Sequence, residues 1–141
     1  MRIAIGADHR GYRQKELIKN RLEDIPWLDV GATDARRSDY PIFAHAVCEL
    51  INADSADRGI LLCGSGIGMA IVANRYPGIY AGVAWQPDVA VHGRRQDDIN
   101  VLVIPSDFVP SNTVLKIVKV WLDTRFGGAR YQERLDMIDG G

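Results

Sequence analysis

The residues of this sequence best suited to chemistry form a glycine-rich stretch that contains a cysteine. It reads Cys63-Gly64-Ser65-Gly66-Ile67-Gly68, at the end of an apolar run and the start of a helical pattern. Such glycines let the backbone approach a ligand, and free amides at a helix start favour an anion. The same amides favour a thiolate, so we predict a lowered pKa for Cys63 and a role as base or nucleophile. The alternative is a simple strand-to-helix turn; no P-loop lysine follows.

A second polar group follows the first apolar run of the chain. Asp8 and His9 stand between that run and a helical pattern. Asp8 could cap the helix, contact a ligand, or do both. An imidazole at the mouth of a parallel sheet lies where substrate contacts concentrate, so His9 is a candidate ligand-binding residue. Of the other histidines, His45 is predicted to be solvated, and the role of His92 is open.

Two arginines, a tyrosine and a second cysteine complete the set. Arg130 and Arg134 are four residues apart, so on a helix both guanidinium groups project from one face, as suits a phosphate. A solvated surface helix is the competing interpretation. Tyr40 begins a predicted helix, where its phenol either lines a pocket or packs. Cys48 lies one position from an apolar helix face and is predicted to be a small buried side chain.

The elements that would position these residues alternate along the chain. Short apolar runs rich in β-branched residues predict buried strands at 3–5, 59–63, 79–83 and 101–104, and a weaker run predicts one at 27–30. Helical periodicity lies between them. One helix has Pro41 in its first turn, and another follows the capping candidates Ser111 and Asn112.

This alternation predicts an α/β fold. Right-handed crossovers give a parallel sheet of about five strands with helices on both faces, and ligands bind outside the carboxyl ends of its strands. No repeat or linker divides the chain, so we expect a single domain over 1–141. The last helix, 129–138, contains few apolar residues, so we expect it to lie against another subunit.

Composition excludes several classes of function. The chain has 141 residues, 47% apolar and 25% charged, which suits one globular domain. With 17 basic and 18 acidic side chains the protein is almost neutral, so it has no electrostatic field that would attract it to nucleic acid or a membrane surface. The sequence shows no signal peptide or spanning segment, and its two cysteines suit neither a disulfide scaffold nor a metal site. These features favour the cytoplasm.

Five motifs, in order along nearly the whole chain, resemble the ribose-5-phosphate isomerase B and galactose-6-phosphate isomerase family. They are Gly6-Ala7-Asp8-His9, Asp39-Tyr40-Pro41, Cys63 to Met69, Ala73-Asn74, and Gly127-Gly128 with Arg130 and Arg134. The resemblance implies a Rossmann-like three-layer sandwich. It also implies a homodimer with active sites shared between subunits, while pairing into tetramers is open. The implied reaction is aldose–ketose isomerisation of a sugar phosphate through an enediolate, without metal or cofactor, as in the pentose phosphate pathway.

The resemblance also implies roles for individual residues. Cys63 would abstract the proton, Ser65 would help to move the hydroxyl proton, and glycine amides would stabilise the enediolate oxygen. Substrate contacts would come from Asp8, His9, Tyr40, Gly64, Gly66, Gly68 and Asp97. Phosphate contacts would come from His9, Arg130 and Arg134, with the arginines reaching into the neighbouring subunit's site.

Four positions depart from the family pattern. Gln96 replaces a histidine that opens the sugar ring, Asp97 replaces an asparagine, Asp107 replaces an arginine that contacts phosphate in some members, and Tyr131 replaces a histidine. Glutamine has no proton equilibrium near neutral pH. On a continuous helix His92 would share a face with Gln96 and could open the ring instead, although Gly93 weakens that helix.

Several functions are therefore in competition. The leading hypothesis is isomerisation of ribose 5-phosphate to ribulose 5-phosphate. The alternatives are isomerisation of an open-chain tetrose phosphate such as erythrulose 4-phosphate, or of a hexose 6-phosphate, and a non-catalytic sugar-phosphate-binding subunit. A nucleotide-binding module is suggested by the fold alone.

Overall fold

All the predicted strands form, and they lie parallel in one sheet. The computed structural model describes residues 1–140, in which the strands are β1 (Ile3–Ala7), β2 (Trp27–Gly31), β3 (Arg58–Cys63), β4 (Ala81–Val83) and β5 (Val101–Pro105). Their order across the sheet is β2-β1-β3-β5-β4. This arrangement confirms the predicted α/β class.

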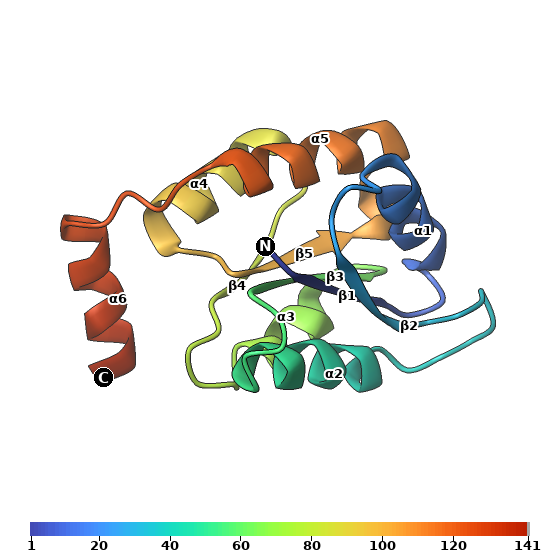
Figure 1. Ribbon diagram of the computed structural model, residues 1–141, viewed down its shortest axis with the longest axis horizontal. Helices are drawn as coiled ribbons and strands as arrows, with labels where there is room; N and C mark the ends of the chain where they lie inside the picture. The colour runs from blue at the N-terminus through green and yellow to red at the C-terminus, as the bar shows by residue number, and fades with distance from the viewer. Residues whose placement is uncertain (141) are drawn as a thin grey trace.

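Helices cover both faces of the sheet (Figure 1). They are α1 (Tyr12–Arg21), α2 (Tyr40–Asn52), α3 (Ile67–Ala73), α4 (Pro87–Asp97), α5 (Ser111–Asp123) and α6 (Arg130–Gly140), with a 3-10 helix η1 (Ser106–Phe108). Helices α1, α4 and α5 lie on one face, and α2 and α3 lie on the other. The three layers of a Rossmann-like sandwich are therefore present.

Successive side chains along each strand point to opposite faces of the sheet, so the hydrophobic core has two parts, one on each face. In β3, Ile60 and Leu62 pack with the α5 layer, which is centred on the fully buried Trp121. Leu61 and Cys63 pack with α2 and α3 on the other face. Because successive strand side chains point to opposite faces, Cys63 is directed towards α3 at the point where β3 ends.

The structure corrects one predicted strand start and one predicted helix cap. The strand predicted from residue 79 begins at Ala81, because the Ile79 amide donates to the Tyr76 carbonyl (3.2 Å) in a turn. Neither Ser111 nor Asn112 caps α5. Pro110 is the N-cap residue, and its carbonyl accepts hydrogen bonds from the amides of residues 113 and 114, both at 3.0 Å. A backbone carbonyl thus begins this helix without a side-chain cap.

The last helix stands apart from the sandwich (Figure 1). Leu135 is its buried residue, whereas Met137 is 75% exposed and Ile138 is 63% exposed. The packing of this helix against another subunit stays a prediction. Within residues 1–140 we find no helix with the length and apolarity needed to span a bilayer.

Candidate active site

The two loops singled out in the sequence are neighbours in the structure. β1 and β3 are adjacent, and the chain winds outwards from them in opposite directions. The amide of Asp8, just after β1, donates to the carbonyl of Leu62 near the end of β3 (3.2 Å). Ligands of open α/β sheets bind at such a reversal, outside the carboxyl ends of the strands. The loops that contain His9 and Cys63 are therefore adjacent and together make one candidate site.

Cys63 is the buried centre of this site. Its side chain is 4% exposed, and the Gly66 amide donates to its Sγ (3.3 Å). Gly66 has a φ of 77°, a conformation that glycine adopts without strain and that turns the chain back towards the sulfur. The thiol is thus held where β3 passes into α3.

The prediction of a lowered Cys63 pKa is wrong. Burial raises the pKa of the thiol above its ordinary value, although hydrogen bonds from the amides of Gly66 and Met69 act in the opposite direction. The nearby Asp8 carboxylate raises it further. Desolvation of the charged form outweighs the amides here because the sulfur is almost wholly shielded from water. The thiolate therefore forms more readily at alkaline pH.

This environment gives an expected order of thiol alkylation. Iodoacetamide should label Cys63 before Cys48, whose side chain is fully buried and whose pKa burial raises to about 12. Since the thiolate is the nucleophile, the Cys63 rate should rise as pH increases above neutrality. Peptide mass spectrometry after timed labelling measures both rates. A Cys63 rate that is already constant at neutral pH, or faster labelling of Cys48, would contradict this prediction.

Tyr40 packs against the glycine loop. A Cβ on Gly68 would lie 2.4 Å from Cε1 and Cζ of the tyrosine ring, so the ring occupies the space that any other residue at 68 would fill. Tyr40 is the first residue of α2, with Pro41 in the first turn as predicted, and it remains 38% exposed. It both packs on the loop and presents its phenol at the edge of the site.

Asp8 and His9 are fixed by hydrogen bonds within their own region. Asp8 is 5% exposed, and its Oδ1 accepts from the amides of Arg10 (3.0 Å) and Gly11 (3.3 Å). Since Gly11 is itself the N-cap residue of α1, Asp8 closes the turn before the helix and does not cap it. His9 Nδ1 lies 3.2 Å from both the amide nitrogen and the carbonyl oxygen of Ser38. These contacts involve Oδ1 of Asp8 and Nδ1 of His9. The other polar atom of each side chain, Oδ2 of Asp8 and Nε2 of His9, takes no part in them.

The outer side of the loop carries Ser65 and an ion pair that sequence reasoning missed. Ser65 is exposed, and its Oγ accepts from the Ile67 amide (3.2 Å). Arg10 pairs with Asp107 at 2.7 Å, directly over Gly64. The available signal was the position of Arg10, two residues after Asp8 in the loop that follows β1.

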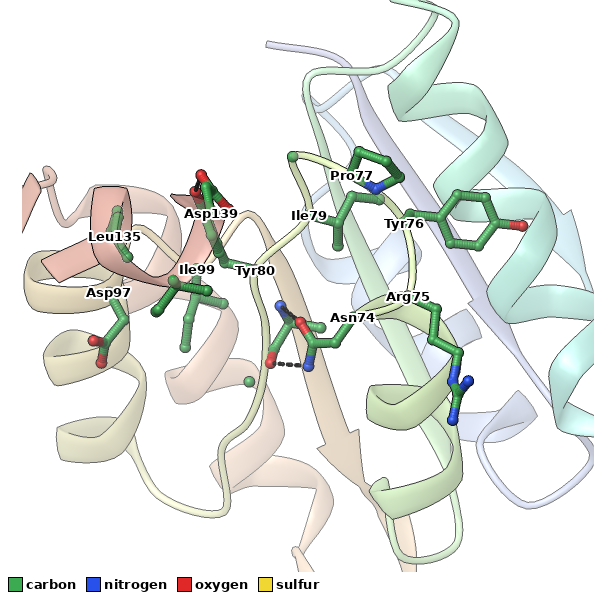
Figure 2. Close-up of a pocket in the computed structure, with 14 residues that line it drawn as sticks. Asn74, Arg75, Tyr76, Pro77, Ile79, Tyr80, Asp97, Ile99, Leu135 and Asp139 are labelled. Atoms are coloured by element: carbon green, nitrogen blue, oxygen red, sulfur yellow. Dashed lines mark hydrogen bonds between the residues drawn. The ribbon is translucent and has the colours of Figure 1, made fainter. Parts of the chain in front are cut away.

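The remaining predicted residues lie elsewhere in the same chain. α4 ends at Asp97, shortly before β5 begins beside Gly59, so Asp97 lies at the amino edge of the sheet, opposite the edge where β3 ends at Cys63. Asp97 lines a cavity of about 790 Å³ with Ile99 and Leu135, and residues that follow α3 line its other side (Figure 2). Asn74 and Ala81 close part of this wall by two backbone–side-chain hydrogen bonds, at 2.8 and 2.9 Å.

Helix α6 places its two arginines near this amino edge as well. The Gly127 amide donates to the Arg95 carbonyl (2.8 Å), which fixes the start of the final segment beside the end of α4. Arg130 and Arg134 are both exposed on the helix. One chain therefore does not bring either of them to Cys63.

His92 lies on an unbroken α4, four residues before Gln96, so the predicted shared face exists. Its side chain is exposed. Gly93 does not break the helix because it is buried, and a Cβ there would lie 2.3 Å from Ile99 Cδ1. Glycine at this position thus admits the Ile99 side chain. Among residues 1–140, no cluster of three His, Cys, Asp or Glu side chains has the arrangement of a metal site.

Known proteins are similar to this chain in both sequence and architecture. The profile of the ribose/galactose isomerase family matches residues 3–138. Ribose-5-phosphate isomerase B of Escherichia coli is 36% identical over 139 residues, which cover 97% of this chain and 93% of that protein.

Solved structures agree over the same length. Ribose-5-phosphate isomerase B of Clostridium thermocellum superposes with a TM-score of 0.96 at 36% identity, covering 99% of this chain and 96% of that one. The Mycoplasma genitalium enzyme with bound ribulose 5-phosphate gives a TM-score of 0.93 at 34% identity, covering 99% and 94%. The match of family profile, sequence and fold over almost every residue shows that this chain belongs to the ribose/galactose isomerase family.

Proposed function

We propose that this protein is an aldose–ketose isomerase that interconverts ribose 5-phosphate and ribulose 5-phosphate. The observation that carries the proposal is the gathering of Cys63, Asp8, His9 and Tyr40 at the carboxyl edge of β1 and β3. The names of its relatives and the ribulose 5-phosphate held by the Mycoplasma genitalium protein support the choice of sugar. Two free thiols suit a reducing compartment, so we place the reaction in the cytoplasm, within pentose phosphate metabolism.

The proposed chemistry begins with the Cys63 thiolate. It takes the proton from the carbon next to the carbonyl, and the electron pair moves onto the carbonyl oxygen to form an enediolate. The resulting thiol then returns the proton to the neighbouring carbon, while Ser65 Oγ transfers the hydroxyl proton between the two oxygens. Asp8 Oδ2 holds sugar hydroxyls. No redox partner is needed, because hydrogen only changes position within the sugar.

The glycine amides donate hydrogen bonds to two groups, the Cys63 sulfur and the substrate oxygen. The Gly66 amide already donates to Cys63 Sγ, so it stabilises the thiolate. The amides of Gly64 and Gly68 are then assigned to the oxygen on which negative charge develops. A donor aimed at that oxygen acts strongly in a site that excludes water.

The phosphate end of the site requires a second copy of the chain. Arg130 and Arg134 are exposed on α6, the helix that stands apart from the sandwich (Figure 1). Ile67, which begins α3 within the glycine-rich stretch, is 62% exposed, and Ile71 on the same helix is 54% exposed. We assign these apolar side chains to a homodimer interface through which the partner's α6 reaches His9. The cations of one subunit and the thiol of the other would then complete each site.

A tetrose phosphate remains a second candidate substrate because Gln96 cannot carry a proton. A purified-protein assay should compare ribose 5-phosphate, allose 6-phosphate, galactose 6-phosphate and erythrulose 4-phosphate. We expect the highest kcat/KM for ribose 5-phosphate, and His92→Ala should slow this furanose much more than the open-chain tetrose. Faster turnover of the tetrose by the unmodified protein would replace the proposed substrate. If the unmodified protein and His92→Ala turn over ribose 5-phosphate equally fast, His92 does not open the sugar ring.

A further inference from the structure

We propose that Arg10 and Asp107 form a displaceable ion pair at the active site, in which Arg10 exchanges the Asp107 carboxylate for the phosphate of the substrate. This inference rests on the proposed function, since it assigns one end of that site. It adds a cation from the same chain as Cys63 to those expected from the partner subunit. It also gives Asp107 the role of an internal counter-ion.

The fold brings these two residues together across the end of β3. Arg10 belongs to the loop after β1, and Asp107 belongs to η1 after β5, while β3 lies between those strands. Arg10 Nη1 lies 2.7 Å from Asp107 Oδ2. The Asp107 amide also donates to the Gly64 carbonyl (3.1 Å), which ties η1 to the residue that follows Cys63.

The ion pair lies directly on the glycine loop. A Cβ on Gly64 would be 2.8 Å from both Arg10 Cδ and Asp107 Oδ2. Glycine at 64 therefore allows the arginine stem and the carboxylate to rest on the backbone beside the thiol. The pair therefore stands next to the residue that would act on the reacting carbon of the substrate.

Exposure makes the pair suitable for exchange. The side chains of Arg10 and Asp107 are 58% and 39% exposed. Ion pairs this accessible to water contribute little to stability, so breaking this one costs the fold little. By contrast, the Asp8 carboxylate is buried and takes part in two amide hydrogen bonds, so it is not a comparable partner for Arg10.

Charge decides which anion Arg10 prefers. A sugar phosphate carries close to two negative charges and three acceptor oxygens, and a guanidinium binds such a group through two parallel donors. The carboxylate offers one charge. A phosphate that binds at this edge would thus displace the Asp107 carboxylate from Arg10. The displaced carboxylate would remain close to the phosphate and repel it. The two residues must therefore affect phosphate binding with opposite signs.

Calorimetric titration of the full-length protein with inorganic phosphate tests this directly, without turnover. Arg10→Gln should raise the phosphate Kd about tenfold, and Arg10→Lys should recover part of the loss. Asp107→Asn should lower the Kd several-fold because it removes the competing charge. Arg2→Gln is the matched control, because Arg2 forms a similar exposed pair with Asp57 (3.3 Å) at the opposite end of β1. It should leave the Kd unchanged.

Each outcome decides the proposal. An unchanged Kd in Arg10→Gln, a raised Kd in Asp107→Asn, or no phosphate binding by the unmodified protein overturns it. In sugar-phosphate assays, Arg10→Gln should raise KM with little change in kcat, as loss of uniform binding does. If the opposite Kd shifts occur but no sugar phosphate is isomerised, the proposed function fails while the anion exchange stands. If Arg10→Gln isomerises the sugar phosphate normally with an unchanged KM, the anion exchange fails while the proposed function stands.

Discussion

Replacing Cys63 with alanine is expected to reduce turnover of the sugar phosphate by about 10² to 10⁴-fold, the usual contribution of a positioned general base. The loss should appear in kcat, with substrate still bound, because the sulfur contacts the proton that moves and not the phosphate. The side chain lies against α3 in a well-packed layer, so removing one sulfur should leave the fold intact. Steady-state kinetics, with circular dichroism as a check on folding, measure both effects.

Cys48→Ala is the matched control for this substitution. Cys48 is the other free thiol, fully buried on α2 in the same layer as Cys63, and no proposed step uses it. Its removal creates a cavity of the same size but should leave kcat and KM unchanged. Near-normal turnover in Cys63→Ala, or an equal loss in both variants, would remove the Cys63 thiol from the proposed mechanism.

Mixing two inactive variants is expected to restore activity if the sites are shared between subunits. One variant carries Cys63→Ala, and the other carries Arg130→Ala with Arg134→Ala. Each lost charge-assisted phosphate contact costs about 1.5–3 kcal/mol, so the double arginine variant should be nearly inactive. A hybrid dimer has one site with both defects and one intact site. Random exchange should therefore recover about a quarter of the wild-type activity, as expected for a two-fold symmetric dimer.

Native mass spectrometry can establish that the subunits exchange before activity is measured. The control mixture pairs Cys63→Ala with a chain that carries all three substitutions, and it should stay inactive because neither kind of site is complete. Confirmed exchange without recovered activity would contradict the shared site and leave the two arginines without a role at Cys63.

The architecture of this protein could be predicted from local sequence patterns. Runs of β-branched residues such as Val101-Leu102-Val103-Ile104 indicate strands that are buried on both faces, and helical stripes lie between them. Alternating strands and helices admit few topologies because the crossovers share one hand. The loops after β1 and β3 were therefore expected at the same edge of the sheet, and the adjacency of these two strands in the structure places Asp8 and His9 beside the Cys63 loop.

Some details depended on residues distant in the sequence. The position of β5 between β3 and β4 is not encoded in any local pattern, yet it brings Asp107 to Arg10 over Gly64. Likewise, Gly93 weakens a helix by its own propensity, but here it makes room for Ile99. Contacts of this kind depend on side chains that meet only after the chain has folded.

The electrostatics of Cys63 show where sequence patterns stop and tertiary structure begins. The glycine-rich turn placed a thiol among amides, and the Gly66 amide does donate to it. The direction of the pKa shift, however, was decided by burial under α3 and by the Asp8 carboxylate, both of which raise it. Residue types and spacing determined which groups could react. Only the packing of distant elements fixed how much water reaches the sulfur, and desolvation is the largest contribution to its charge equilibrium.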